Sequence, residues 1–154
     1  MRDFNEADRN KKKARIQLKK NPANLSDEAL SKLEEAVKAS LKEGYLPCPV
    51  AWKLAEDAGV PRIAVGEITD RFGIRVTNCQ LGCFRVDKTV QEYPPDTDLD
   101  SEIVSKLETL KENNELTCAG VFDLARQLKL KPMAIADVMN IRKLKIHDCQ
   151  LGCF

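Results

Sequence analysis

Apolar side chains recur every three or four residues in two separate parts of the chain. The first stripe consists of Leu30, Leu33, Val37 and Leu41. The second consists of Ile103, Leu107 and Leu110. This spacing predicts two amphipathic helices. Ser26 is suited to cap the first helix at its N-terminus, and Gly44 is suited to end it.

The second half of the chain repeats the first at a constant offset. Residues 45–84 align without a gap with residues 115–154, and both copies end in Cys-Gln-Leu-Gly-Cys-Phe. Outside this run 5 of 34 paired positions are identical, whereas within it all six are. Uniform drift would rarely produce that contrast. We therefore expect the run to be either a tight turn with buried small residues or a thiol site.

The apolar spacing around Gly59 resembles that of the helix-turn-helix family. Leu54 and Ala55 precede this glycine by five and four residues, and Val65 and Ile68 follow it by six and nine. In that family a small residue lets two helices cross closely, and a glycine makes the turn between them. The resemblance covers residues 51–70 and the equivalent stretch of the second copy.

A short strand is expected after the second helix of the pair, because residues 74–78 alternate apolar and polar side chains. Gly82 would let Cys79 and Cys83 flank a tight hairpin. Three helices followed by a strand resemble a winged-helix unit. We therefore expect a mainly α protein with short β-hairpins, built from two tandem winged-helix-like helix-turn-helix units.

Charge and proline content suggest where these units begin and end. Residues 1–20 hold eight Lys/Arg against three Asp/Glu, although the net charge of the chain is +1. Two adjacent prolines at 94 and 95 favour an extended linker. We expect a basic N-terminal arm (1–24), a first repeat (25–86), a linker (87–95) and a second repeat (96–154).

Several functional classes are disfavoured by the sequence. No apolar run approaches the roughly 18 residues that span a bilayer, and the N-terminus lacks the apolar core of a signal peptide. We therefore expect a cytoplasmic protein without a membrane partner. No Gly-rich phosphate loop or Ser-His-Asp pattern is present, so we expect no enzymatic activity.

The helix-turn-helix resemblance implies binding to double-stranded DNA, with the second helix of each pair in the major groove. In the first copy that helix would present Arg62, Thr69 and Arg71. In the second copy it would present Lys131, Asn140, Arg142 and Lys143. The arm would either contact phosphates or form a solvated tail. Its candidate side chains are Lys11, Lys12, Lys13 and Arg15. The expected function is a DNA-binding transcriptional regulator.

The six cysteines form a second candidate site, with three in each repeat. They are Cys48, Cys79 and Cys83 in the first repeat and Cys118, Cys149 and Cys153 in the second. Thiolates suit zinc or an iron-sulfur cluster, although three ligands leave one position of a closed site open. A redox switch and plain burial are the alternatives. A thiol site would favour a different function, namely an accessory module that handles a metal, a cofactor or a protein partner.

Overall fold

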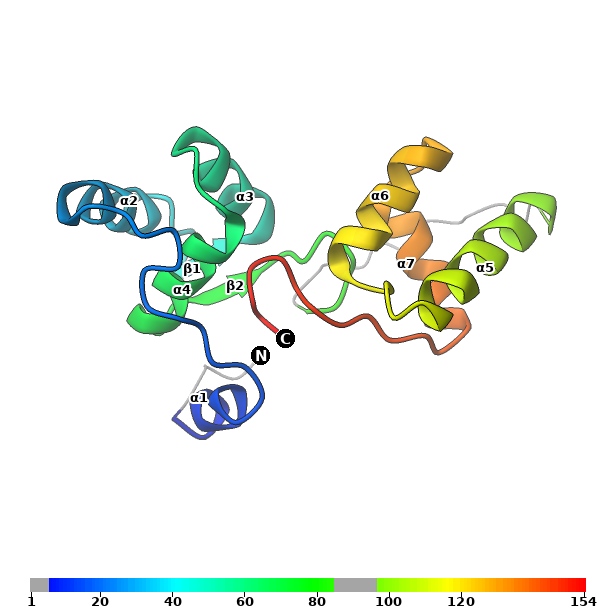
Figure 1. Ribbon diagram of the computed structural model, residues 1–154, viewed down its shortest axis with the longest axis horizontal. Coiled ribbons are helices and arrows are strands. Elements are labelled where there is room, and N and C mark those ends of the chain that lie inside the picture. Colours follow the sequence, from blue (N-terminus) through cyan, green and yellow to red (C-terminus); the bar gives the residue numbers. More distant parts are fainter. Residues whose placement is uncertain (1–5, 85–96) are drawn as a thin grey trace. The chain divides into compact units, whose positions relative to one another are not determined.

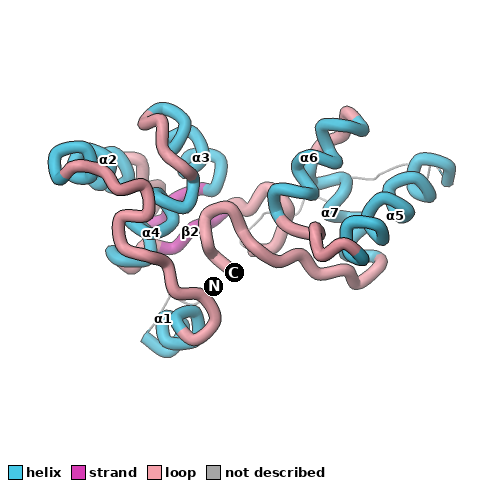
Figure 2. Tube along the Cα trace, viewed as in Figure 1, coloured by secondary structure: helices cyan, strands magenta, loops and turns pink. Residues whose placement is uncertain are grey.

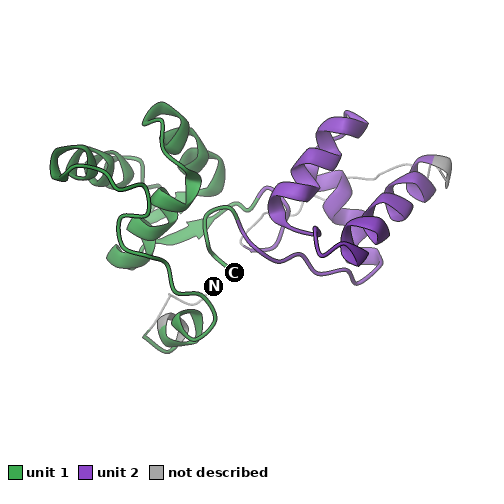
Figure 3. Cartoon of the chain, in the orientation of Figure 1, with its two compact units in different colours: residues 1–79, 150–154 green, residues 80–149 purple. Residues whose placement is uncertain are grey.

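The computed structural model describes residues 6–84 and 97–154 (Figure 1). Within these ranges the chain is mainly helical with two short strands, which confirms the expected fold class. It divides into two compact units: unit 1 comprises residues 1–79 and 150–154, and unit 2 comprises residues 80–149 (Figure 3). The expected linker, residues 87–95, lies outside the described residues. In the part of the chain that is described, no helix has the length and apolar character needed to cross a membrane.

Unit 1 is built around three packed helices. Its elements are α1 (Glu6–Lys13), α2 (Asp27–Ala39), β1 (Tyr45–Pro47), α3 (Cys48–Asp57), α4 (Arg62–Phe72) and β2 (Arg75–Thr77). Ser26 caps α2, because its hydroxyl oxygen accepts a hydrogen bond from the backbone N–H of Ala29 at 3.3 Å. The predicted stripe of α2 faces the core, where Val37, Val65 and Ile68 are fully buried.

The strands of unit 1 pair differently from the prediction. Strand β2 lies parallel to β1, with Leu46 opposite Val76, so the expected hairpin is wrong. After Thr77 the chain leaves the sheet at Asn78, whose φ is +52°, and residues 79–84 continue as a loop (Figure 2). Strand β1 takes the place that the second hairpin strand would have filled. It is too short to show an alternating pattern in the sequence.

Unit 2 repeats this arrangement with α5 (Thr97–Glu112), α6 (Cys118–Leu128) and α7 (Pro132–Ile141). Thr117 caps α6 by accepting a hydrogen bond from the backbone N–H of Gly120 at 3.0 Å. An isolated parallel bridge joins Thr117 to His147, at the positions equivalent to Pro47 and Thr77 in unit 1. The core includes Ile103, Leu107 and Ile135, all fully buried.

The two units also share their positive-φ turns at equivalent positions of the repeat. The pairs are Gly59 (+64°) with Lys129 (+55°), Gly73 (+68°) with Lys143 (+55°), Asn78 (+52°) with Asp148 (+52°), and Gly82 (+68°) with Gly152 (+67°). Lys129 and Lys143 adopt the left-handed backbone conformation. This conformation costs free energy for a residue with a β-carbon. The backbone path is therefore preserved where the residue type is not.

Candidate nucleic-acid interface

Helix α4 of unit 1, the first expected DNA-reading helix, is enclosed by other parts of its unit. All residues from Ala64 to Thr69 are buried. Thr69 is 2% exposed, and its hydroxyl donates a hydrogen bond to the backbone carbonyl of Gly66 at 2.8 Å. Thr69 therefore does not face solvent as the sequence predicted.

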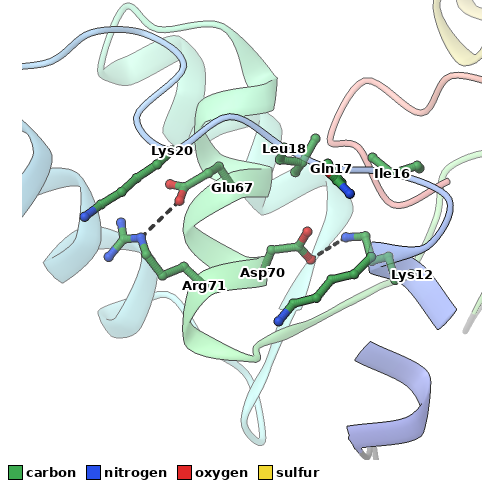
Figure 4. Close-up of a pocket in the computed structure, with 9 residues that line it drawn as sticks. Lys12, Ile16, Gln17, Leu18, Lys20, Glu67, Asp70 and Arg71 are labelled. Carbon is green, nitrogen blue, oxygen red and sulfur yellow. Dashed lines mark hydrogen bonds and ion pairs between the residues drawn. The ribbon is translucent and has the colours of Figure 1, made fainter. Parts of the chain in front are cut away.

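The basic arm covers one side of α4 (Figure 4). The Lys12 ammonium forms an ion pair with the carboxylate of Asp70, and the Lys12 side chain is 18% exposed. The two segments together line a pocket of about 520 Å³. It is lined by Lys12, Lys13, Ile16, Gln17, Leu18 and Lys20 of the arm and by Glu67, Asp70 and Arg71 of α4. Lys11, Lys13 and Arg15 remain exposed. This part of the arm packs on protein and is not a free tail.

Arg71 is held within unit 1 by two carboxylates. Its Nε atom donates to Glu67 at 3.0 Å, and its Nη2 atom donates to Glu34 at 2.7 Å. The hydrogen bond to Glu67 is the main cause of a raised Arg71 pKa, although burial acts in the opposite direction. The guanidinium therefore stays charged and serves to join α2 to α4.

Arg62 at the start of α4 is also engaged. Its guanidinium carbon lies 3.4 Å from the ring centroid of Trp52, a cation–π contact, and the group donates a hydrogen bond to the side chain of Gln150. Gln150 begins the segment Gln150–Phe154, which belongs to unit 1 and covers another side of α4. All three residues expected to reach DNA from the first copy thus make contacts inside their own unit.

Helix α7 of unit 2 presents its expected residues to solvent. Lys131, Asn140, Arg142 and Lys143 are all exposed. These residues lie at the two ends of the helix, and its middle is buried, including Ala134, Ile135 and Val138. Ile141, at the end of the helix, is 79% exposed. Of the two helices predicted to read DNA, α7 is the one whose predicted contact residues are all exposed.

Charge is distributed unevenly over unit 2. Residues 129–148, which contain α7 and its flanks, hold five Lys/Arg and two Asp. Residues 98–127, which contain most of α5 and all but the last residue of α6, hold three Lys/Arg and seven Asp/Glu. Unit 2 therefore has a basic segment around its exposed helix and an acidic remainder.

Each predicted set of three cysteines is divided between the two units. Cys83 belongs to unit 2, whereas Cys48 and Cys79 belong to unit 1. Likewise Cys153 belongs to unit 1, whereas Cys118 and Cys149 belong to unit 2. Among residues 6–84 and 97–154, no three or more His, Cys, Asp or Glu side chains are grouped so as to hold a metal ion. The predicted zinc or iron-sulfur site gains no support from this arrangement.

Three of the six cysteines are buried in the structure. Cys48, Cys79 and Cys118 are buried, Cys149 and Cys153 are partly buried, and Cys83 is exposed. Pro47 is the capping residue of α3, and Cys48 is the first residue of the helix. The equivalent Cys118 also begins its helix, after the cap Thr117. The buried positions fit the interpretation of cysteine as a small core residue.

Comparison of the chain with protein-family models, with curated proteins and with solved structures finds no match. The interpretation of each unit therefore depends on its own residues and on the internal repeat. Sequence reasoning missed the docking of Gln150–Phe154 against α4. Its signal was the complete identity of the two six-residue runs, which a turn alone does not require.

Proposed function

We propose that the protein is a DNA-binding transcriptional regulator in which α6 and α7 act as a helix-turn-helix pair. Helix α7 enters the major groove. The observation that carries this proposal is the exposure of Lys131, Asn140, Arg142 and Lys143 on and beside α7. Their counterparts in unit 1 lie on or beside α4, which is covered by the arm and by Gln150–Phe154.

The chemistry of these side chains supports the assignment. Asparagine can form two hydrogen bonds with adenine, and arginine can form two with guanine, in the major groove. Lys131 and Lys143 supply charge for phosphates, which provide most of the sequence-independent affinity. The acidic α5 disfavours DNA on its side of unit 2, so a duplex is directed to α7.

The proposal is tested by selecting bound sequences from a randomised duplex library and then measuring affinity against salt concentration. The variant Arg142→Ala/Lys143→Ala should bind at least about tenfold more weakly and lower the salt slope by about 1, because one base contact and one phosphate contact are lost. The matched control is Lys106→Ala/Lys111→Ala on α5, which removes the same charge. Equal losses in both variants, or no bound duplex at low salt, would refute the proposal.

A second candidate is a protein-interaction module, and the exposure of Ile141 favours it. A large apolar side chain that is 79% exposed beside basic residues is suited to the centre of a protein interface. The variant Ile141→Ser distinguishes the two functions. It should abolish capture of a protein partner, whereas DNA affinity should change little because the phosphate contacts remain.

A further inference from the structure

The segment Gln150–Phe154 fits unit 1 through specific contacts. Its first residue accepts a hydrogen bond from Arg62, which stacks on Trp52. Its second residue, Leu151, is 1% exposed. The backbone of Leu151 lies so close to α4 that only a glycine, Gly66, fits beneath it. These contacts describe a binding site for a short peptide segment.

The third residue of the segment adds a backbone requirement. Gly152 has a φ of +67°, and a β-carbon at this position would lie 2.8 Å from the side chains of both Ile63 and Leu18. Any other residue would be strained by the conformation and crowded by these neighbours. Unit 1 therefore selects the sequence Gln-Leu-Gly. It hydrogen-bonds the glutamine side chain, buries the leucine and requires the backbone conformation of the glycine.

Both copies of the six-residue run are divided in the same way. Unit 1 is interrupted after Cys79 and resumes at Gln150, and unit 2 runs from Gln80 to Cys149, so both boundaries follow the first cysteine of a run. Each unit thus includes the end of the other repeat's run. Leu81 is 4% exposed, much like Leu151 at 1%. The two sites differ in one respect, because Ala136 stands in unit 2 where Gly66 stands in unit 1.

We propose that this site in unit 1 also accepts the Gln-Leu-Gly-Cys-Phe segment of a second copy of the chain, which gives a segment-swapped dimer. The contacts with Arg62, Gly66 and Ile63 are made by the segment itself. A second copy offers the same segment with the same side chains, and the chain already exchanges identical segments between its repeats. Exchange of identical elements between protomers is a low-cost route to dimers. The inference is independent of DNA binding.

The covalently attached segment has the advantage of a high effective concentration, about millimolar for a short connection. The intact chain is therefore expected to be a monomer in dilute solution. Swapping becomes measurable when the site of one chain is left empty and the segment of another is released. Two variants can create that situation.

The first variant lacks residues 150–154, so its site in unit 1 is empty. The second is Gly66→Ala, whose added methyl group excludes its own segment. Alanine is compatible with this helical position, because Ala136 occupies the equivalent place in α7. Only the segment of the second variant can fill the site of the first.

The two variants are mixed, and the assembly is measured by native mass spectrometry and light scattering. A one-to-one dimer should form in the mixture and in neither variant alone. The control adds Leu151→Ala to the Gly66→Ala chain, which should weaken the mixed dimer at least about tenfold because the buried leucine is lost. Folded variants that stay monomeric when mixed would overturn the proposal.

A separate measurement covers the case in which either variant does not fold. The chain lacking residues 150–154 is refolded with a synthetic peptide of residues 148–154 at about 1 mM, near the expected effective concentration. Recovery of the helical circular dichroism signal, or direct binding if the chain is already folded, supports a site that works in trans. Absence of both effects overturns the proposal. A peptide with Leu151→Ala is the matched control and should be at least about tenfold less effective.

Discussion

Gly66 on α4 lies directly beneath the backbone carbonyl of Leu151. A β-carbon at position 66 would be 2.7 Å from that carbonyl carbon and closer still to its oxygen. Backbone atoms cannot rotate away as the end of a side chain can. A larger residue must therefore displace the whole Gln150–Phe154 segment from α4.

This relationship predicts the sign of a stability change. Helix propensity alone says that Gly66→Ala should stabilise the protein by about 1 kcal/mol. Displacement of Leu151 removes about 2–3 kcal/mol of burial. We expect a net loss of about 1–2 kcal/mol in the free energy of unfolding, measured by urea denaturation, with faster hydrogen exchange at residues 151–154. A gain in stability would show that the segment is not held against α4.

The backbone conformation of Lys129 should lower the stability of unit 2, and a glycine at this position should relieve the strain. It turns the chain between α6 and α7 at a φ of +55°, where unit 1 has Gly59. The left-handed conformation costs an L-residue about 1–2 kcal/mol, and the greater flexibility of glycine in the unfolded chain offsets part of that. Lys129→Gly should raise the stability of unit 2 by about 0.5–1 kcal/mol in thermal denaturation.

The control for this effect is Lys106→Gly, within α5. The same replacement in a helix should lower stability by about 1 kcal/mol, because glycine is a poor helix former. A loss of stability in both variants would mean that the Lys129 side chain has a role that its backbone conformation does not reveal.

The ion pair between Lys12 and Asp70 should keep the arm against α4 but add little to the free energy of unfolding of unit 1. Both side chains are partly exposed, at 18% and 31%, so solvent screens their attraction. In a double-mutant cycle of Lys12→Met and Asp70→Asn, we expect a coupling energy of no more than about 1 kcal/mol. Hydrogen exchange at residues 12–20 should nevertheless accelerate in each single variant.

The matched control for the arm is Lys11→Met, which removes the same charge from an exposed neighbour. It should leave both stability and exchange unchanged. If Lys11→Met and Lys12→Met accelerate exchange equally, the arm is held by its overall charge and not by this pair.

Much of the fold follows from local sequence signals. The Ser26 cap, the buried stripe of α2 and the internal repeat were all predicted, because each depends on residues close together or on direct identity. Strand β1 was not predicted, since this short strand is stabilised by pairing with β2, which lies beyond both α3 and α4 in the sequence. Local patterns do not identify such distant partners.

The candidate site was harder to predict for the same reason. The spacing of residues on α4 shows which side chains share a face, but not what covers that face. Thr69 on α4 is buried, and the arm and the Gln150–Phe154 segment that lie against this helix come from the two opposite ends of the chain. The cysteine spacing likewise predicts two sets of three, whereas the division of each run places Cys83 and Cys153 in the opposite units.

The arm makes a final prediction about the proposed DNA binding. Lys12 is paired with Asp70, whereas Lys11, Lys13 and Arg15 are exposed. If the arm adds phosphate contacts, replacing these three residues with alanine should lower the salt slope by up to about 2.7, or about 0.9 for each lost contact. Lys12→Ala should leave the slope unchanged, because its charge is already neutralised by Asp70. Binding isotherms from about 50 to about 200 mM salt provide the measurement. A slope that falls by about 0.9 with Lys12→Ala would instead show that the arm leaves α4 when DNA binds, and that Asp70 then loses its partner.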